Sequence, residues 1–149
     1  MLFEEAPTQN TIPIEIWVDG ACIPNPGNGG WGVLMVYKGL KQEFSGPVKD
    51  TTNNRMELTA AIKALSIIDK RSKIIIYSDS RYVIDGITKW IHGWLKTNKK
   101  NILNLDLWMQ LHKLNNFHSV KWVWVKGHEF NDGNNRADEL ANTAATRRK

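Results

Sequence analysis

Cysteine is nearly absent from this chain of 149 residues, in which Cys22 stands alone. A single cysteine excludes an intrachain disulfide, which suits a reducing compartment. Apolar runs are also short, and none approaches the ~18 residues that a membrane-spanning helix needs. The first residues contain Glu4 and Glu5 where a signal peptide would be basic. The sequence therefore predicts a soluble, cytoplasmic protein.

Motifs for nucleotide cofactors and for zinc are missing as well. Gly27, Gly29 and Gly32 satisfy the G-x-G-x-x-G spacing, but strand-type residues follow them where a dinucleotide fold needs a helix. We therefore expect these glycines to shape a hairpin. No G-K-[ST] occurs, which excludes a Walker A loop, and the histidines never fall at zinc-ligand spacing. A nucleophilic pair of Cys22 and His128 has no local signature to support it.

Positive charge is what the sequence has in excess. Its 20 Lys and Arg residues outnumber the 15 Asp and Glu residues, for a net charge of +5. This surplus suggests a polyanionic partner, although simple solubility also explains it. Nothing in the sequence implies a protein partner, so we expect a monomer.

The hydrophobic pattern predicts one α/β domain over residues 11–149, preceded by a flexible arm at 1–10. Alternating apolar residues from Ile12 predict a strand that ends at Asp19-Gly20. Two further β-type runs follow at 31–37 and about 41–48. Three consecutive strands with short turns form an antiparallel meander.

Helical patterns alternate with strands in the rest of the chain. Asn54 and Glu57 have capping-box spacing at the start of an apolar helical stripe. The run 73–77 is apolar throughout, which predicts a buried strand parallel to its neighbour. The remaining predicted elements are a helix over 80–96 that is interrupted or bent near Gly86 and Gly93, a helix over 105–114 with Leu107, Leu111 and Leu114 inward, a strand over 120–125 and a helix over 135–146.

Acidic residues stand at the ends of these elements. Asp19 and Asp79 each follow a strand, and Glu57 and Asp138 lie in the first turns of predicted helices. Ligands of open α/β sheets bind at the carboxyl ends of strands, where all four acids can meet. Ordinary alternatives exist for three: a turn residue for Asp19, a capping-box residue for Glu57, and a helix-dipole partner for Asp138. Asp79 is the hardest to explain in this way.

Converging carboxylates repel one another and raise one another's pKa values. Divalent cations relieve the repulsion, and Mg²⁺ prefers oxygen ligands while it keeps several waters. Two such ions ~3.5–4 Å apart generate an attacking hydroxide and stabilise the leaving oxygen in phosphodiester cleavage. The four acids thus predict a nuclease that uses two Mg²⁺ ions, or Mn²⁺ in their place.

The acids belong to short motifs in a fixed order. These are Asp19-Gly20-Ala21-Cys22, Asn25-Pro26-Gly27, Gly29-Gly30-Trp31, Thr51-Thr52-Asn53-Asn54-Arg55-Met56-Glu57-Leu58, Ser78-Asp79-Ser80, Lys126-Gly127-His128, and Asn134 with Asp138-Glu139-Leu140-Ala141. As a set they resemble bacterial-type type 1 ribonuclease H. The resemblance implies a ribonuclease H-like fold, in which helices flank a five-stranded mixed sheet of an antiparallel meander plus two parallel strands. It also implies hydrolysis of the RNA strand of RNA–DNA hybrids, leaving 5′-phosphate and 3′-hydroxyl ends.

Catalytic roles follow from the same resemblance. Asp19, Glu57, Asp79 and Asp138 would be catalytic metal ligands. His128 would lie on a mobile loop and assist proton transfer or product release, a task that suits a histidine with a pKa near its reference value. An ordinary surface histidine is the alternative for His128.

Substrate contacts are implied for three further groups. Asn25, Asn53 and Asn54, with Cys22 beside them, resemble residues that contact the minor groove, where amides can bond 2′-hydroxyls and base edges. Helix capping is the alternative for Asn53 and Asn54. Thr52 and Asn104 match a pocket for a DNA-strand phosphate. The third group resembles a basic handle and comprises Lys89, Trp90, Trp94, Lys96, Lys99 and Lys100.

The handle and the pocket each have a second interpretation. Trp90 and Trp94 could instead anchor a solvated helix to the core. In the phosphate pocket, Asp50 stands where the family has an arginine, with Lys49 beside it as the alternative cation.

Two other functions remain to be weighed. A non-catalytic hybrid-binding module would carry a damaged acid set, whereas all four acids are intact here. A DNA-cutting relative of the transposase or integrase type would share the fold and the metal chemistry. The asparagine set and the basic handle favour the ribonuclease over that relative.

Overall fold

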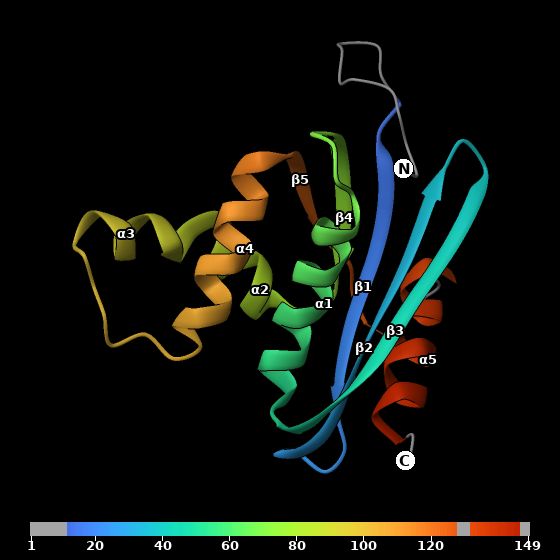
Figure 1. Cartoon of the computed structure of the whole chain (residues 1–149), viewed down its shortest axis with the longest axis horizontal. Helices are drawn as coiled ribbons and strands as arrows, with labels where there is room; N and C mark the ends of the chain where they lie inside the picture. Colours follow the sequence, from blue (N-terminus) through green and yellow to red (C-terminus); the bar gives the residue numbers. More distant parts are fainter. Residues whose placement is uncertain (1–11, 128–131, 147–149) are drawn as a thin grey trace.

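Five strands form one mixed sheet in the order β3-β2-β1-β4-β5 (Figure 1). The computed structural model describes residues 12–127 and 132–146. The strands are β1 (Ile14–Cys22), β2 (Gly27–Tyr37), β3 (Leu40–Thr51), β4 (Lys73–Ser78) and β5 (Ser119–Trp124). The first three pair antiparallel, whereas β4 is parallel to both β1 and β5. The predicted mixed sheet of a meander plus two parallel strands is confirmed.

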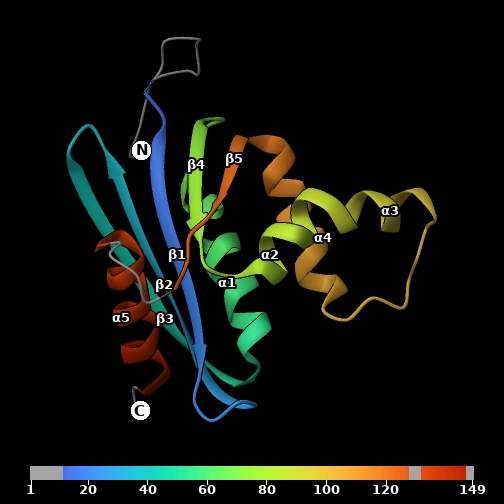
Figure 2. The ribbon, with the colours of Figure 1, turned by 180° about the vertical axis from the view of Figure 1, so that it is seen from behind.

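Helices cover both faces of this sheet. They are α1 (Asn53–Ile67), α2 (Arg81–Asp85), the π-helical turn η1 (Gly86–Trp90), α3 (Ile91–Lys96), α4 (Leu105–Phe117) and α5 (Asp132–Thr146). In Figure 1, α1 and α4 lie on one face of the sheet and α5 lies on the other, where Figure 2 shows it from behind. None of the helices described here reaches the length and apolarity that crossing a bilayer requires.

The core fills the space between the sheet and α1. Alternate residues of β1 and β4, among them Ile16 and Ile76, point to the same face and are fully buried. Small residues of α1 such as Ala61 let the helix approach the sheet closely, and Leu65 fills the layer beside them. The largest fully buried side chain is that of Trp108 in α4. Of the α4 residues predicted to point inward, Leu111 is buried, whereas Leu107 and Leu114 are only half-buried.

The glycines with dinucleotide-type spacing lie in β2, which forms the expected antiparallel hairpin with β1. A Cβ at Gly30 or Gly32 would collide with the backbone of α5, at Ala141 and Ala137 respectively. Their small size therefore serves helix-on-sheet packing, which brings α5 directly onto β2.

Several element ends differ from the sequence prediction. β1 continues to Cys22, because residues beyond Asp19 still pair with β2, up to Cys22 opposite Gly29. α5 begins at Asp132, three residues before the predicted start. The predicted arm at 1–10 lies outside the described residues.

The helical stretch after β4 changes its winding at Gly86. A single π-helical turn begins there, and a Cβ at Gly86 would overlap the buried ring of Trp108. The predicted interruption at Gly86 is thus confirmed, with close contact to Trp108 as its physical reason. At Gly93 the helix is not interrupted, since α3 runs through that residue.

Gly86→Ala is expected to lower the free energy of unfolding by about 1–3 kcal/mol, because the added methyl overpacks the Trp108 ring. Gly93→Ala is the matched control, since a Cβ there meets nothing within 4 Å. It should leave stability unchanged or raise it by about 0.4–1 kcal/mol. Urea unfolding measures both, and equal effects would contradict the packing assigned to Gly86.

Candidate active site

Asp19 and Asp79 are neighbours at the carboxyl ends of two parallel strands. Trp17 in β1 pairs with Tyr77 in β4, and each acid stands two residues further along the chain, Asp19 within β1 and Asp79 directly after β4. Asp19 lies within the β1–β2 ladder opposite Gly32, so its alternative interpretation as a turn residue is wrong. The expected convergence of these two acids on one edge is confirmed by the register.

Glu57 reaches the same point from α1. Its Oε1 atom accepts a hydrogen bond from the Gly20 backbone N–H at 2.9 Å, inside the protein. A Cβ at Gly20 would collide with the backbone of Met56 and Glu57, so only glycine lets α1 lie this close to β1. The close approach of helix and strand therefore places Glu57 beside Asp19.

The predicted capping box of Asn54 and Glu57 is wrong. Thr52 is the N-cap of α1, and its hydroxyl accepts a hydrogen bond from the Arg55 N–H at 3.2 Å. A threonine hydroxyl satisfies the same orphan donor that an asparagine would. Glu57 is thus free of a capping role and faces the core side instead.

The carboxylates of Asp19, Glu57 and Asp79 form a tight group. Each offers an oxygen, and these oxygens lie within 4.8 Å of one another. Asp19 and Glu57 are 4% and 8% exposed, whereas Asp79 is half-buried. Burial of this kind disfavours charge unless a cation compensates it.

Burial and mutual repulsion raise the pKa values of both buried acids. For Asp19, burial is the largest cause, followed by the charge of Glu57. For Glu57, burial is again the largest cause, followed by the charge of Asp79. The group therefore holds protons that a divalent cation would displace.

Asp138 approaches Asp19 from the opposite face of the sheet. A hydrogen bond between the two side chains contributes to the raised pKa of Asp19. Asn142, one turn later in α5, donates to Asp138 Oδ1 at 3.1 Å and so orients the carboxylate. Since α5 begins at Asp132, Asp138 lies beyond its first turn, and the helix-dipole interpretation is wrong.

The donor set fits a hard divalent cation. All four groups are carboxylates, which suit Mg²⁺ or Mn²⁺, whereas zinc sites use sulfur and nitrogen ligands more often. Burial and neighbouring charge raise the pKa values of Asp19 and Glu57, and a nearby divalent cation would favour their ionised forms. His128 lies outside the described residues.

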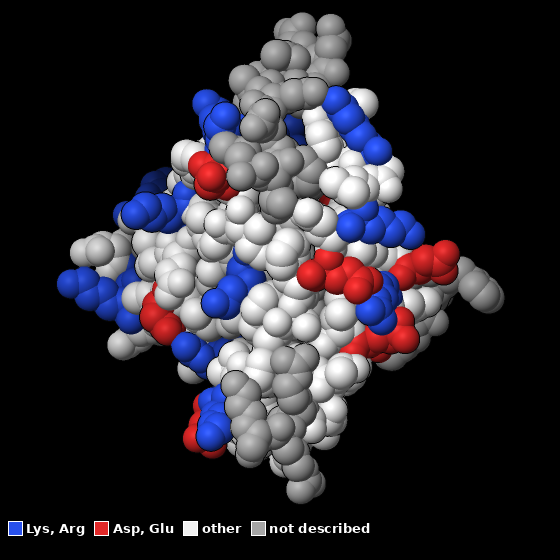
Figure 3. Space-filling model, turned by 45° about the vertical axis from the view of Figure 1, so that its right-hand side comes forward, with Lys and Arg blue, Asp and Glu red and all other residues white. Residues whose placement is uncertain are grey.

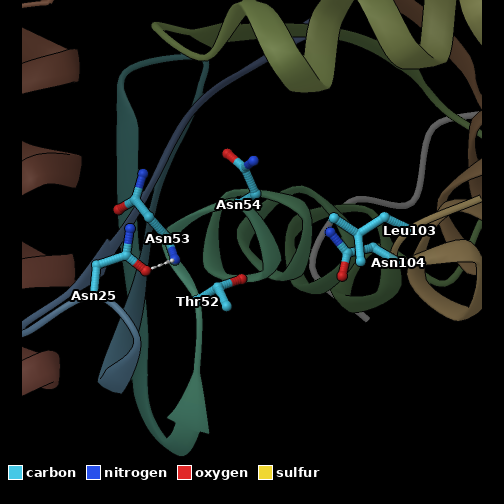
Figure 4. Close-up of a pocket in the computed structure, with 6 residues that line it drawn as sticks. All are labelled: Asn25, Thr52, Asn53, Asn54, Leu103 and Asn104. Carbon is cyan, nitrogen blue, oxygen red and sulfur yellow. Dashed lines mark hydrogen bonds between the residues drawn. The ribbon is translucent and has the colours of Figure 1, made fainter.

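A second cluster of predicted residues lines a pocket of about 330 Å³ beside the start of α1 (Figure 4). Its lining residues are Asn25, Thr52, Asn53, Asn54, Leu103 and Asn104. Asn25 Oδ1 accepts from the Asn53 N–H at 3.1 Å, which ties the turn after β1 to α1. The structure thus brings together the predicted asparagines and the predicted phosphate pair of Thr52 and Asn104. The Cys22 thiol, by contrast, is buried and donates hydrogen bonds to the carbonyl oxygens of Pro24 and Thr51.

The predicted basic handle projects from the body of the molecule at α3 (Figure 1). Lys96, Lys99 and Lys100 are exposed there. Trp94 is half-buried, with its ring 5.5 Å from that of Trp108, whereas Trp90 is 42% exposed. The core-anchor interpretation therefore describes Trp94, and Trp90 presents its ring to solvent.

The lysines of this segment differ in whether an acidic side chain offsets their charge. Lys89 forms an ion pair with Asp85 at 3.6 Å, one turn earlier. The face shown in Figure 3, on another side of the molecule, carries acidic and basic side chains interspersed. The handle, by comparison, holds three lysines within a few residues, where a polyanion would find concentrated charge.

Some residues around the site were missed by sequence reasoning. Asn142 beside Asp138 and Gly20 beside Glu57 act through contacts between distant segments. Arg55 belongs to one of the sequence motifs but had no predicted role of its own. In the structure it donates hydrogen bonds to Asp106 and Asn104. The signal in the sequence that could have pointed to this role of Arg55 is its place among polar residues at the start of a helix.

The fold and the site define an α/β domain with a cluster of acids that could hold a metal ion beside the parallel strands. The RNase H family model matches residues 12–146. Proteins named Ribonuclease H from Francisella philomiragia and Francisella tularensis are each 51% identical over 133 residues, which cover 86% of this chain and 88% of theirs. This chain belongs to the RNase H family.

Solved structures agree with this assignment. LC9-RNase H1, a type 1 RNase H with the type 2 active-site motif, is 32% identical with a TM-score of 0.83. The alignment covers 95% of this chain and 74% of that one. LC11-RNase H1, solved in complex with RNA/DNA hybrid, is 25% identical with a TM-score of 0.68, over 89% of this chain and 96% of that one.

Removing one charge from the acid group is expected to stabilise the metal-free protein. Asp19 and Glu57 have folded pKa values above their unfolded values near ~4, so stability is full below pH ~4 and falls as pH rises. Asp79→Asn relieves repulsion on both acids. In EDTA at pH 8, it should raise the free energy of unfolding by about 1 kcal/mol, with no gain near pH 4.

Urea unfolding at the two pH values measures this effect. Asp69→Asn, which removes an exposed aspartate outside the acid group, is the control and should change little. An Asp79→Asn protein no more stable than the wild type at pH 8 would show that the carboxylates do not repel one another.

Proposed function

We propose that this chain cuts the RNA strand of RNA–DNA hybrids, as an endonuclease, with divalent metal ions held by its acids. The observation that carries the proposal is the convergence of Asp19, Glu57 and Asp79 within 4.8 Å. The chain's 51% identity to proteins named Ribonuclease H supports the choice of reaction. The products would carry 5′-phosphate and 3′-hydroxyl ends.

Asp19, Glu57, Asp79 and Asp138 would hold two Mg²⁺ ions, or Mn²⁺ in their place. Such ions, when bound, activate water and stabilise charge on the leaving oxygen. The chain itself fixes the ligands: the Gly20 N–H bonds Glu57, and Asn142 bonds Asp138. Carboxylates held in place before the metal arrives lose little freedom when it binds, which favours tight and ordered coordination.

The amide-lined pocket would contact the hybrid on one side of these acids. Asn25, Asn53 and Asn54 offer both donors and acceptors, which suits 2′-hydroxyls and base edges in a wide minor groove. Thr52 and Asn104 would bind the backbone of the DNA strand. The structure of LC11-RNase H1 with RNA/DNA hybrid supports a hybrid as the ligand. Because α1 carries both Asn54 and Glu57, a strand bound at the pocket would pass close to the acids.

The handle would add sequence-independent affinity. Lys96, Lys99 and Lys100 would neutralise phosphates, and the exposed ring of Trp90 would stack on a sugar or base. Lys89 would contribute less, since Asp85 already offsets its charge. A cytoplasmic location and a monomeric state stay predictions of the sequence.

Substrate choice is the direct test of this proposal. Labelled RNA–DNA hybrid, duplex RNA and duplex DNA are incubated with Mg²⁺ or with EDTA. We expect cleavage of the RNA strand of the hybrid only, and only with Mg²⁺. Asp79→Asn should lower turnover by a factor of about 10³ or more while the fold is kept, because a ligand of the metal is lost. Cleavage of duplex DNA, or activity in EDTA, would refute the assignment.

A proton-transfer or product-release role for His128 predicts a partial effect. His128→Ala should reduce turnover by about 10²-fold without abolishing it, in the range of a lost acid–base group. His112→Ala, in α4, is the control and should cut at the wild-type rate. An unchanged turnover number for His128→Ala would favour the interpretation as an ordinary surface residue.

A further inference from the structure

Hydrogen bonds fix the side chain of Asn104 from both ends. Its Oδ1 accepts from Arg55 Nη1 at 3.1 Å, and its Nδ2 donates to the Tyr82 hydroxyl at 3.1 Å. A carboxamide nitrogen carries two hydrogens, and Tyr82 takes one, which leaves the other for a ligand. The backbone of Asn104 is left-handed, with φ 63°, a conformation that asparagine tolerates better than most residues.

Arg55 is held in turn by Asp106, in the first turn of α4. Arg55 Nη1 and Nη2 donate to Asp106 Oδ1 and Oδ2 at 3.0 and 2.8 Å, a bidentate pair that ties α1 to α4. Such a pair fixes the plane of the guanidinium and offsets its charge. Arg55 is therefore aimed at Asn104, and its charge is already matched by a carboxylate.

Tyr82 connects the same asparagine to the core. Its hydroxyl also accepts a hydrogen bond from Trp108 Nε1 at 3.2 Å. Trp108 is fully buried, so the Tyr82 hydroxyl is hydrogen-bonded to a side chain of the core. Asn104 is thus hydrogen-bonded on one side to the Arg55–Asp106 ion pair and on the other to Tyr82, which contacts Trp108.

The pocket that Asn104 lines contains only uncharged side chains. Asn25 and Asn53 stand on one side, Leu103 and Asn104 stand on the other, and Thr52 lies between them (Figure 4). A pocket of this composition can bind a phosphodiester through oriented neutral donors. The orientation of each donor then matters more than it would for a flexible lysine.

We infer that Arg55 and Tyr82 are positioning residues, which hold the Asn104 carboxamide so that its remaining hydrogen bonds the nucleic-acid backbone. The inference rests on the proposed function, from which the pocket takes its ligand. Arg55 itself does not contact the phosphate, and its loss weakens binding only by freeing Asn104. Neutral donors release no counterions, so this contribution does not depend on salt, unlike that of the handle lysines.

The test measures binding of fluorescently labelled RNA–DNA hybrid by anisotropy, in Mg²⁺, in the Asp79→Asn background. Arg55→Met keeps the aliphatic stem and removes the guanidinium. We expect it to weaken binding about tenfold, the size of one charge-assisted hydrogen bond. Tyr82→Phe should weaken binding in the same direction. In the background with Asp79 intact, Arg55→Met should raise KM and leave kcat within about twofold.

Arg136→Met is the matched control. Arg136 also forms a two-point pair with a carboxylate, donating from Nε and Nη2 to Glu43 at 2.6 and 2.9 Å, and it joins α5 to β3 on the other face of the sheet. It should leave hybrid affinity unchanged. The double variant Arg55→Asp with Asp106→Arg restores the ion pair with its charges exchanged. Its free energy of unfolding in urea should return toward that of the parent, whereas its affinity for hybrid should stay as weak as that of Arg55→Met.

Salt dependence separates positioning from direct contact. The slope of log affinity against log salt should be the same for Arg55→Met as for the parent, whereas Lys99→Met should flatten it by about 0.9. A flatter slope for Arg55→Met would overturn the inference, as would affinity equal to that of Arg136→Met. Hybrid binding that changes as expected without any cleavage by the wild type would overturn only the proposed activity. Failure of the parent to bind hybrid at all would overturn both.

Discussion

Burial of neighbouring carboxylates is the physical constraint on which the site of this protein depends. Asp19 and Glu57 are almost fully buried, and burial and neighbouring charge raise the pKa values of both. Packing holds them there, because Gly20 lets the backbone of α1 lie against β1. A divalent cation bound between these acids would therefore offset the cost of ionising them. In the proposed function, the amide-lined pocket and the basic handle would bring a phosphodiester to that cation.

Helix α1 links the two halves of the proposed site. Thr52 caps this helix and lines the pocket, and Arg55 hydrogen-bonds Asn104, which lines the opposite side of that pocket. Glu57, further along the same helix, lies beside Asp19 and Asp79. Since a helix rises ~1.5 Å per residue, α1 fixes the spacing between Asn54 at the pocket and Glu57 at the acids. The same contact at Gly20 that sets Glu57 therefore also sets the distance from the pocket to the acids.

Strand periodicity and parallel pairing made much of this predictable from sequence. In the sequence, Asp19 and Asp79 each come after a run of apolar strand residues, and the carboxyl ends of parallel strands lie at the same edge of a sheet. Local spacing failed where a distant segment decided the outcome. Asn54 and Glu57 have capping-box spacing, but Thr52 is the residue that caps the helix. The Glu57 carboxylate instead accepts a hydrogen bond from the Gly20 N–H, 37 residues away in the sequence. The roles of Gly30 and Gly32 likewise depend on α5, which no local pattern in β2 reveals.

The pKa values of the carboxyl groups themselves test the central claim most directly. In ¹³C-labelled protein, the carboxyl resonances of Asp19 and Glu57 are followed by NMR against pH, with and without Mg²⁺. The account predicts pKa values well above ~4 in the metal-free protein and a marked fall on addition of Mg²⁺. Values near ~4 that Mg²⁺ leaves unchanged would contradict it.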